Sequence, residues 1–132
     1  MLNIQLLLIV LHYCGEIWGR TRFQKIIFLL QERFEIKFSY RFIPYHYGPY
    51  SKDLQFDIDL LHFAGAIQVE LRDGTPYMYS LAQKGIELAQ KAEQKIDPGE
   101  LQRLIAGVDY IKYRSTDSLI EEAKSIANLA IQ

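Results

Sequence analysis

This chain of 132 residues has one cysteine and four prolines, and its 15 basic side chains are nearly balanced by 16 acidic ones. The single thiol, Cys14, excludes a disulfide framework and a cysteine-based zinc site. A formal net charge of -1 argues against a protein that holds nucleic acid by a bulk positive field. Because a chain with one thiol fits a reducing compartment most simply, we expect a cytoplasmic location.

Long apolar runs are also scarce. The strongest one, residues 6–11, is far shorter than the roughly 20 residues that span a bilayer. No positive charge precedes this run and no small-residue cleavage site follows it, unlike a secretion signal. We therefore expect a core helix here and no membrane partner.

The composition is that of one globular domain, with 49% apolar and 23% charged residues.

The first half of the chain predicts three helices and an extended segment. Residues 2–13 predict a first helix that ends at Gly15. Thr21 and Gln24 have the spacing of a capping box at the start of a second helix. Residues 38–47 favour an extended segment, and residues 47–50 predict a turn. Ser51 is then a good N-cap for a third helix that runs to about residue 64.

The second half begins with a hairpin pattern. Residues 67–71 and 77–81 alternate apolar and polar positions around Asp73 and Gly74, a strong hairpin signal. Helices are predicted over residues 82–95, 100–113 and 118–130. Ser118 and Glu121 have capping-box spacing at the start of the last helix.

This order of elements is typical of a winged helix-turn-helix, a mainly α (α+β) fold with a two-stranded wing. We expect residues 1–96 to form the winged-helix domain, with the third helix in the recognition position. Residues 97–132 then form a C-terminal helical extension, which is either part of the same compact domain or a dimer element.

Three motifs carry a family resemblance. Residues 22–30 (RFQKIIFLL) resemble the LQKLLYF helix of a prokaryotic group, and residues 45–54 (YHYGPYSKDL) resemble the YGPYS-x-x-L turn that follows it there. These patterns are typical of YwgA-like proteins and, more loosely, of the Panacea domain of SocA-type antitoxins. Residues 79–85 (YSLAQKG) are similar to the Y-x-L-T-x-x-G end of many wings. The resemblance covers about residues 2–95 and implies a winged-helix fold with a regulatory or antitoxin-linked role.

The third helix has two apolar stripes. One is formed by Leu54, Ile58 and Leu61, and the second lies nearly opposite. From residue 51 to 64 the helix carries one lysine and three aspartates, a net charge of -2. The second stripe needs a cover, which the C-terminal helices or a partner chain would supply. Its members are our candidate partner-binding residues on this helix: Phe56, Leu60 and Phe63.

Positive charge is concentrated between residues 16 and 41, where six basic side chains outnumber three acidic ones. If nucleic acid binds, phosphate contacts are expected from the start of the second helix and from the wing. The third helix offers one amide for an adenine and one ammonium for guanine or phosphate. The alternative is an ordinary solvated helix face. The nucleic-acid candidates are Arg20, Arg22, Lys25, Lys52, Gln55 and Arg72.

Aromatic residues gather between residues 38 and 50. One interpretation is that they pack around the Gly-Pro turn and fix the third helix against the second. The other is a tyrosine-rich contact surface, because tyrosine is enriched at interfaces. On the second interpretation Tyr45, Tyr47 and Tyr50 bind a partner.

Signals of catalysis are weak. The histidines His12, His46 and His62 lack metal-ligand spacing, and there is no Gly-rich phosphate loop or Ser nucleophile elbow. Asp57 and Asp59 lie two positions apart on a helix and so do not share a site. We therefore expect no enzyme activity, no metal and no cofactor.

Two functions from different classes stay open. The first is a DNA-binding transcriptional regulator that holds double-stranded DNA as a homodimer. The second is a protein–protein interaction module, antitoxin-like or adaptor, that has the winged-helix fold without DNA binding. A continuous positive face from the second helix to Arg72 would support the first, and exposure of Phe56, Leu60 and Phe63 would support the second.

Overall fold

The computed structural model describes residues 1–131, with side chains described through residue 128. The chain is a mixed α and β protein with six helices and two small antiparallel sheets in this part. No described helix is both long enough and apolar enough to cross a bilayer. The elements, in chain order, are α1 (Asn3–Cys14), β1 (Glu16–Ile17), α2 (Arg20–Glu32), β2 (Ile43–Tyr45), β3 (Gly48–Tyr50), α3 (Lys52–Phe63), β4 (Ile67–Arg72), β5 (Thr75–Leu81), α4 (Gln83–Glu93), α5 (Pro98–Ile111) and α6 (Thr116–Ile131).

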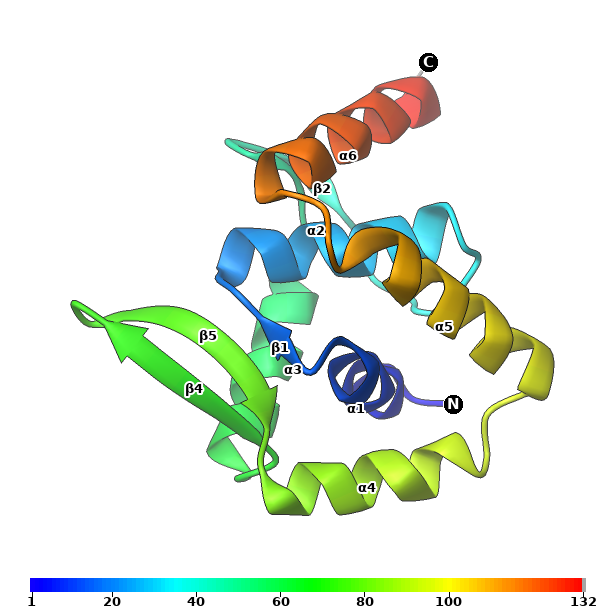
Figure 1. Ribbon diagram of the computed structural model, residues 1–132. Helices are drawn as coiled ribbons and strands as arrows, with labels where there is room; N and C mark the ends of the chain where they lie inside the picture. The colour runs from blue at the N-terminus through cyan, green and yellow to red at the C-terminus, as the bar shows by residue number, and fades with distance from the viewer. Residues whose placement is uncertain (132) are drawn as a thin grey trace.

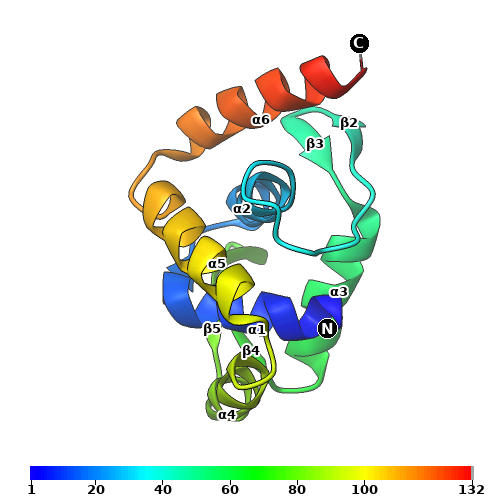
Figure 2. The same cartoon turned by 90° about the vertical axis from the view of Figure 1, so that its right-hand side faces the viewer.

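Helix α1 lies at the centre of the molecule, with α3, α4 and α5 packed against it (Figures 1 and 2). Its residues 6–11 are at most 4% exposed, which confirms the prediction of a core helix. Such a helix is apolar on every side because other elements surround it. Helix α2 packs against α5, α6 and β3. The C-terminal helices share this core through Leu104, Val108, Ile111, Leu119 and Ala123.

The larger sheet has the order β1-β5-β4, and all of its pairs are antiparallel. The β4–β5 hairpin projects away from the helices (Figure 1). Its turn, Asp73–Gly74, has positive φ at both residues (53° and 77°), so the predicted hairpin is confirmed. Strand β1 was not predicted, because two residues are too few to show a period; Ile17 pairs with Tyr79.

Some predicted boundaries hold and others are wrong. Helix α5 covers Pro98–Ile111 rather than residues 100–113, because Asp97 caps it and Pro98 occupies its first position. Gly15 ends α1 with φ of 77°, as expected. The Thr21 capping box is absent, because α2 begins two residues earlier than a Thr21 cap requires, after Gly19, whose φ is 97°. The predicted turn over residues 47–50 is instead strand β3, and the turn lies at residues 46–47. The last helix begins at Thr116, with the Ser118 N–H bonded to Ser115 Oγ rather than Ser118 acting as the cap.

Candidate interaction surfaces

Helix α3 is fixed at its start by Ser51, which is buried. Ser51 Oγ accepts a hydrogen bond from the Leu54 N–H at 3.1 Å and caps the helix as predicted. The Ser51 N–H also donates to Gln24 Oε1 at 2.8 Å, and Gln24 Nε2 donates to the Ser51 carbonyl at 2.9 Å. One buried amide on α2 therefore satisfies both backbone groups of the residue that starts α3. Local spacing had suggested only a capping role for Gln24, because its partner lies 27 positions away.

The two apolar stripes of α3 differ in burial. Phe56, Leu60 and Phe63, which we call the outer stripe, are 66%, 43% and 91% exposed. The C-terminal helices do not cover them, because α5 and α6 pack against α1, α2 and β3 instead. Figure 2 shows α3 at the edge of the molecule, with no described element outside it. The opposite stripe faces the core, as predicted: Leu54, Ile58 and Leu61 are at most 5% exposed.

Acidic side chains accompany the outer stripe. Asp53 and Asp59 are exposed on α3, and Lys52 is the only lysine or arginine of the helix. The Asp57 carboxylate instead accepts a hydrogen bond from the Tyr40 hydroxyl at 2.6 Å, which helps to tie α3 to the preceding segment. The exposed face of α3 is therefore apolar and acidic, which suits neither phosphate contact nor base reading.

Arg22 is part of the internal structure rather than a phosphate ligand. Its Nη1 donates to the Arg114 carbonyl at 2.7 Å and its Nη2 to the Lys112 carbonyl at 3.0 Å. These carbonyls lie just beyond the end of α5, where backbone acceptors need partners from outside the helix. Burial lowers the pKa of this guanidinium. The expectation that Arg22 contacts DNA does not fit this geometry.

Lys25 also differs from its expected place on an exposed helix face. It is 2% exposed, and its Nζ donates to the Pro49 carbonyl at 2.8 Å, beneath the β2–β3 hairpin. Burial, and secondarily the charge of Lys124, lowers the pKa of Lys25 to about 8. The backbone of duplex DNA cannot reach this ammonium from outside as it would reach a surface lysine.

Six of the twelve candidate residues nevertheless line one cavity. We call it the α2 pocket; its volume is about 590 Å³, and it lies between the first turns of α2, the β2–β3 hairpin and the start of α3. The sequence had placed these six in two separate groups, one for nucleic acid and one for a partner. They are Arg20, Lys25, Lys52, Tyr45, Tyr47 and Tyr50.

The last two nucleic-acid candidates, Gln55 and Arg72, are engaged within the chain. Gln55 Nε2 donates to Asp59 Oδ1 at 3.0 Å, so this amide is not presented for an adenine. The guanidinium of Arg72 lies 3.6 Å from the ring centroid of Tyr77, and Trp18 meets the same ring edge-on. Arg72 is therefore exposed at the end of β4 and packed against a neighbouring aromatic ring.

The aromatic segment divides into a core part and a surface part. Phe38 and Tyr40 are buried and stacked, which fits the packing interpretation. Burial, together with the Asp57 carboxylate, raises the pKa of Tyr40. Tyr45 and Tyr47 are 58% and 61% exposed, which fits the contact-surface interpretation. The boundary between the two parts is the start of the hairpin.

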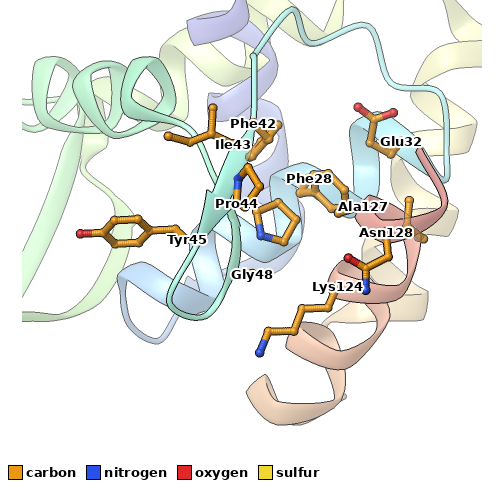
Figure 3. Close-up of a pocket in the computed structure, with 12 residues that line it drawn as sticks. Phe28, Glu32, Phe42, Ile43, Pro44, Tyr45, Gly48, Lys124, Ala127 and Asn128 are labelled. Atoms are coloured by element: carbon orange, nitrogen blue, oxygen red, sulfur yellow. The ribbon is translucent and has the colours of Figure 1, made fainter. Parts of the chain in front are cut away.

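A second cleft lies on the other side of this hairpin, against α6 (Figure 3). It has a volume of about 330 Å³ and includes Phe28, Phe42 and Pro44 among its apolar lining residues. Lys124 and Asn128 line it from α6, while the Tyr45 ring extends away from it in Figure 3. Ile43 and Tyr45 line both cavities, so the β2–β3 hairpin separates the α2 pocket from the cleft against α6.

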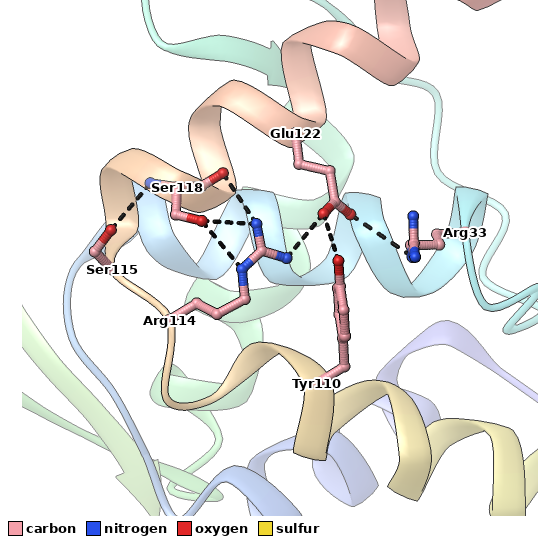
Figure 4. Close-up of polar contacts among 6 residues, drawn as sticks. All are labelled: Arg33, Tyr110, Arg114, Ser115, Ser118 and Glu122. Atoms are coloured by element: carbon pink, nitrogen blue, oxygen red, sulfur yellow. Dashed lines mark hydrogen bonds and ion pairs between the residues drawn. The ribbon is translucent and has the colours of Figure 1, made fainter.

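A polar network at the junction of α5 and α6 holds the C-terminal helix (Figure 4). Glu122 accepts hydrogen bonds from Arg114 Nη1 at 2.8 Å and from the Tyr110 hydroxyl at 2.9 Å. Arg33 Nε on the far end of α2 approaches the second Glu122 oxygen at 3.8 Å. Since every member contacts another part of the chain, we assign this network to structure.

The cysteine and the histidines, residue types that often act in catalysis or metal binding, do not form a common site among the described residues. Burial raises the pKa of the Cys14 thiol to about 12, which disfavours the nucleophilic thiolate. His12, His46 and His62 are all exposed. Among the residues that the structure describes, no three histidine, cysteine or acidic side chains are placed to hold a metal ion.

Comparisons with protein-family models, with curated proteins and with solved structures found no match to this chain. The resemblance to YwgA-like and Panacea proteins therefore stays a hypothesis that depends on the three motifs alone.

Proposed function

We propose that this protein is a winged-helix regulatory protein that binds another protein through the outer stripe of α3, as an antitoxin-like or adaptor module would. The winged-helix assignment is supported by the element order and by β1, which adds a third strand to the β4–β5 hairpin. Membership of the YwgA-like and Panacea group, a cytoplasmic location and the absence of enzyme activity belong to the same proposal.

The observation that carries the proposal is the exposure of the outer stripe. Phe56, Leu60 and Phe63 stand at positions i, i+4 and i+7, so they form one continuous row on the helix surface. Exposed apolar rows of this kind mark protein interaction sites, since aromatic anchors dominate interface energetics. In a winged helix this surface would otherwise face the major groove, where an apolar and acidic helix face is unsuitable.

The chemistry of the stripe also specifies its partner. We expect an apolar ridge, such as one face of an amphipathic helix, flanked by lysine or arginine side chains that complement Asp53 and Asp59. A second copy of this chain is a poorer occupant, because a two-fold contact through α3 would bring the same aspartates toward each other.

The test compares captured partners. We expect tagged wild-type protein to retain a specific protein from an extract of its own cells, and the double variant Phe56→Ser, Phe63→Ser to lose it. With the partner identified and purified, the double substitution should weaken binding at least tenfold, because central aromatic anchors typically contribute on the order of 2 kcal/mol each. Raised salt should slow association if basic side chains flank the contact.

Tyr113→Ser is the matched control, because Tyr113 is 85% exposed and lies outside α3. This variant should bind the partner like the wild type. Equal loss of binding in both variants, or self-association of the wild type through α3, would contradict the proposal.

The DNA-binding alternative retains fewer residues than the sequence suggested. Arg20, Lys52 and Arg72 are exposed and form no ion pair among the described residues. If they hold a duplex, a mobility shift at low salt should disappear in the variant Arg20→Glu, Lys52→Glu and persist in Phe56→Ser, Phe63→Ser. That combination of results would favour the DNA-binding regulator over the protein-binding module.

A further inference from the structure

The α2 pocket has the charge of an anion site. Arg20, Lys25 and Lys52 line it, and none of its lining residues is acidic. The first turn of α2 forms part of the same wall; this helix has no side-chain cap on its first N–H groups and no acidic residue in its first turn. Uncapped N–H groups and the helix dipole add to the positive potential of the three cations.

A second, independent observation is the state of Lys25. Its ammonium is almost completely removed from bulk solvent, yet one carbonyl, that of Pro49, is its only hydrogen-bond acceptor among the described residues. An ammonium has three donors, so this group is under-bonded for its burial. Lys124 adds a second positive charge nearby and lowers the pKa of Lys25 further. An anion bound in the α2 pocket would accept from this ammonium and counter its charge.

The tyrosines that line the α2 pocket indicate which chemical group the anion carries. The rings of Tyr45 and Tyr50 lie 5.2 Å apart between centroids and are inclined by 33°. Tyr45 and Tyr47 are 58% and 61% exposed, and the Tyr45 ring also has the His46 ring 4.6 Å away between centroids, so a planar ring would join an existing aromatic cluster. Stacking on tyrosine faces is a sequence-tolerant way to hold a nucleobase next to a positively charged groove.

We propose that the α2 pocket binds a nucleotide unit, with its phosphate held by Arg20, Lys25 and Lys52 and its base stacked on Tyr45 and Tyr47. The volume of about 590 Å³ lies within the range of small-ligand pockets. The phosphate and the base could belong to a free nucleotide or to one unit of a single-stranded nucleic acid, because both present the same chemistry. This site is separate from the outer stripe of α3, so either proposal can fail without the other.

The experiment is a calorimetric titration of the whole chain with adenosine monophosphate, inorganic phosphate, adenosine and a single-stranded oligonucleotide of ten residues. We expect adenosine monophosphate to bind at least tenfold more tightly than phosphate or adenosine alone. An oligonucleotide that binds no more tightly than the mononucleotide identifies a free nucleotide as the ligand. One that binds much more tightly, with an affinity that falls with salt, identifies a single strand.

Variants separate the two halves of the site. Lys52→Glu should weaken binding of the monophosphate at least tenfold and leave the affinity for adenosine unchanged, whereas Tyr45→Ala should weaken both. The matched control is Lys95→Glu, which reverses an exposed lysine outside the pocket and should have no effect. Circular dichroism should show the same melting temperature for Lys52→Glu and Lys95→Glu.

The outer-stripe variant Phe56→Ser, Phe63→Ser should bind the monophosphate like the wild type. The proposal is overturned if adenosine monophosphate binds no better than inorganic phosphate. It is also overturned if Lys52→Glu and Lys95→Glu lose affinity equally, since that result would indicate only a general attraction to a positively charged protein.

Discussion

At the scale of the residue, Lys25 has the most unusual surroundings among the basic side chains. It comes from an amphipathic helix, where a lysine ordinarily extends into water, and it instead donates to the Pro49 carbonyl beneath a hairpin. Gly48 makes this arrangement possible, because its φ is 100° and a side chain there would lie 3.3 Å from Lys25 Cε and 3.2 Å from Lys124 Cγ. A glycine, two lysines and a carbonyl thus form one packed unit.

The shifted pKa of Lys25 predicts a pH dependence of stability. The pKa is about 8 in the folded chain and near 10.5 in the unfolded chain, so the unfolded state binds more protons between these values. The contribution of Lys25 to the free energy of unfolding should therefore rise with pH across this window, by up to about 1.4 kcal/mol per pH unit. Urea unfolding of the wild type and of Lys25→Met at pH 7, 8.5 and 10 measures it.

Subtracting Lys25→Met from the wild type removes the contribution of other groups that titrate in the same range. The difference should increasingly favour the wild type from pH 7 to pH 10. A difference independent of pH would show that the ammonium is solvated in the folded protein. Lys124→Gln is the companion variant, because removing that charge should raise the pKa of Lys25 and narrow the window.

At the scale of the element, α2 organises the connection to α3. Two of its glutamines, one heptad apart, each bind both backbone groups of a single residue in the following segment. Gln24 binds the N–H and carbonyl of Ser51, and Gln31 binds those of Tyr40, both of the latter at 3.0 Å. These amides take the place of a neighbouring strand, because the segment between α2 and α3 has little regular structure of its own.

Replacing either glutamine should therefore lower the free energy of unfolding, and the loss should be larger where the bonded backbone groups are more deeply buried. Gln24→Leu leaves the buried Ser51 N–H without a partner, whereas the Ser51 carbonyl still accepts from the Gln55 N–H at 3.2 Å, and we expect it to lower the free energy of unfolding by about 2 kcal/mol. Gln31→Leu should cost about 1 kcal/mol, because Gln31 and Tyr40 bond in a partly buried place that water can enter. Chemical denaturation of both variants tests this order.

Hydrogen exchange locates the effect. The amide of Ser51 and the first amides of α3 should exchange faster in Gln24→Leu than in the wild type, with α4 unchanged. Equal losses of stability in Gln24→Leu and Gln31→Leu would contradict the prediction, because they would mean that the bonds to Ser51 stabilise the fold no more than the bonds to Tyr40.

At the scale of the whole molecule, the C-terminal helices belong to the same core as the rest of the chain. Helix α5 contacts both α1 and α2, and its Gly107 lies so close to α2 that an added Cβ would be 2.6 Å from Leu30 Cδ2. Arg22 connects α2 to the carbonyls at the end of α5, and α6 covers α2 and β3. The outer stripe, in contrast, is left out of this core.

The shared core predicts one cooperative unfolding transition. Tryptophan fluorescence, which reports on Trp18 beside the β4–β5 hairpin, and far-ultraviolet circular dichroism, which reports mainly on the helices, should give coincident urea curves. A chain shortened to residues 1–96 should fail to fold, because it would expose the faces of α1 and α2 that α5 and α6 cover. Two separate transitions, or a folded short chain, would show that residues 97–132 form an independent unit.

Features with local causes could be predicted from the order of the residues. The Ser51 cap, the Gly15 stop, the Asp73–Gly74 turn and the buried α1 depend on residues within about one helical turn or on a simple period. Strand β1 escaped prediction because it has only two residues and exists through its pairing with β5.

Which side chains are free to bind a ligand or a partner depends on contacts between distant parts of the chain. Arg22, Gln24 and Lys25 lie within four positions on α2, and each donates to a backbone carbonyl between 24 and 92 positions away; Lys25 has two further donors and lines the α2 pocket. The spacing of neighbouring residues does not predict these hydrogen bonds, because each one depends on which distant segment of the backbone packs against α2. The same long-range packing leaves Phe56, Leu60 and Phe63 exposed on α3. It also places three tyrosines and three basic side chains around the α2 pocket.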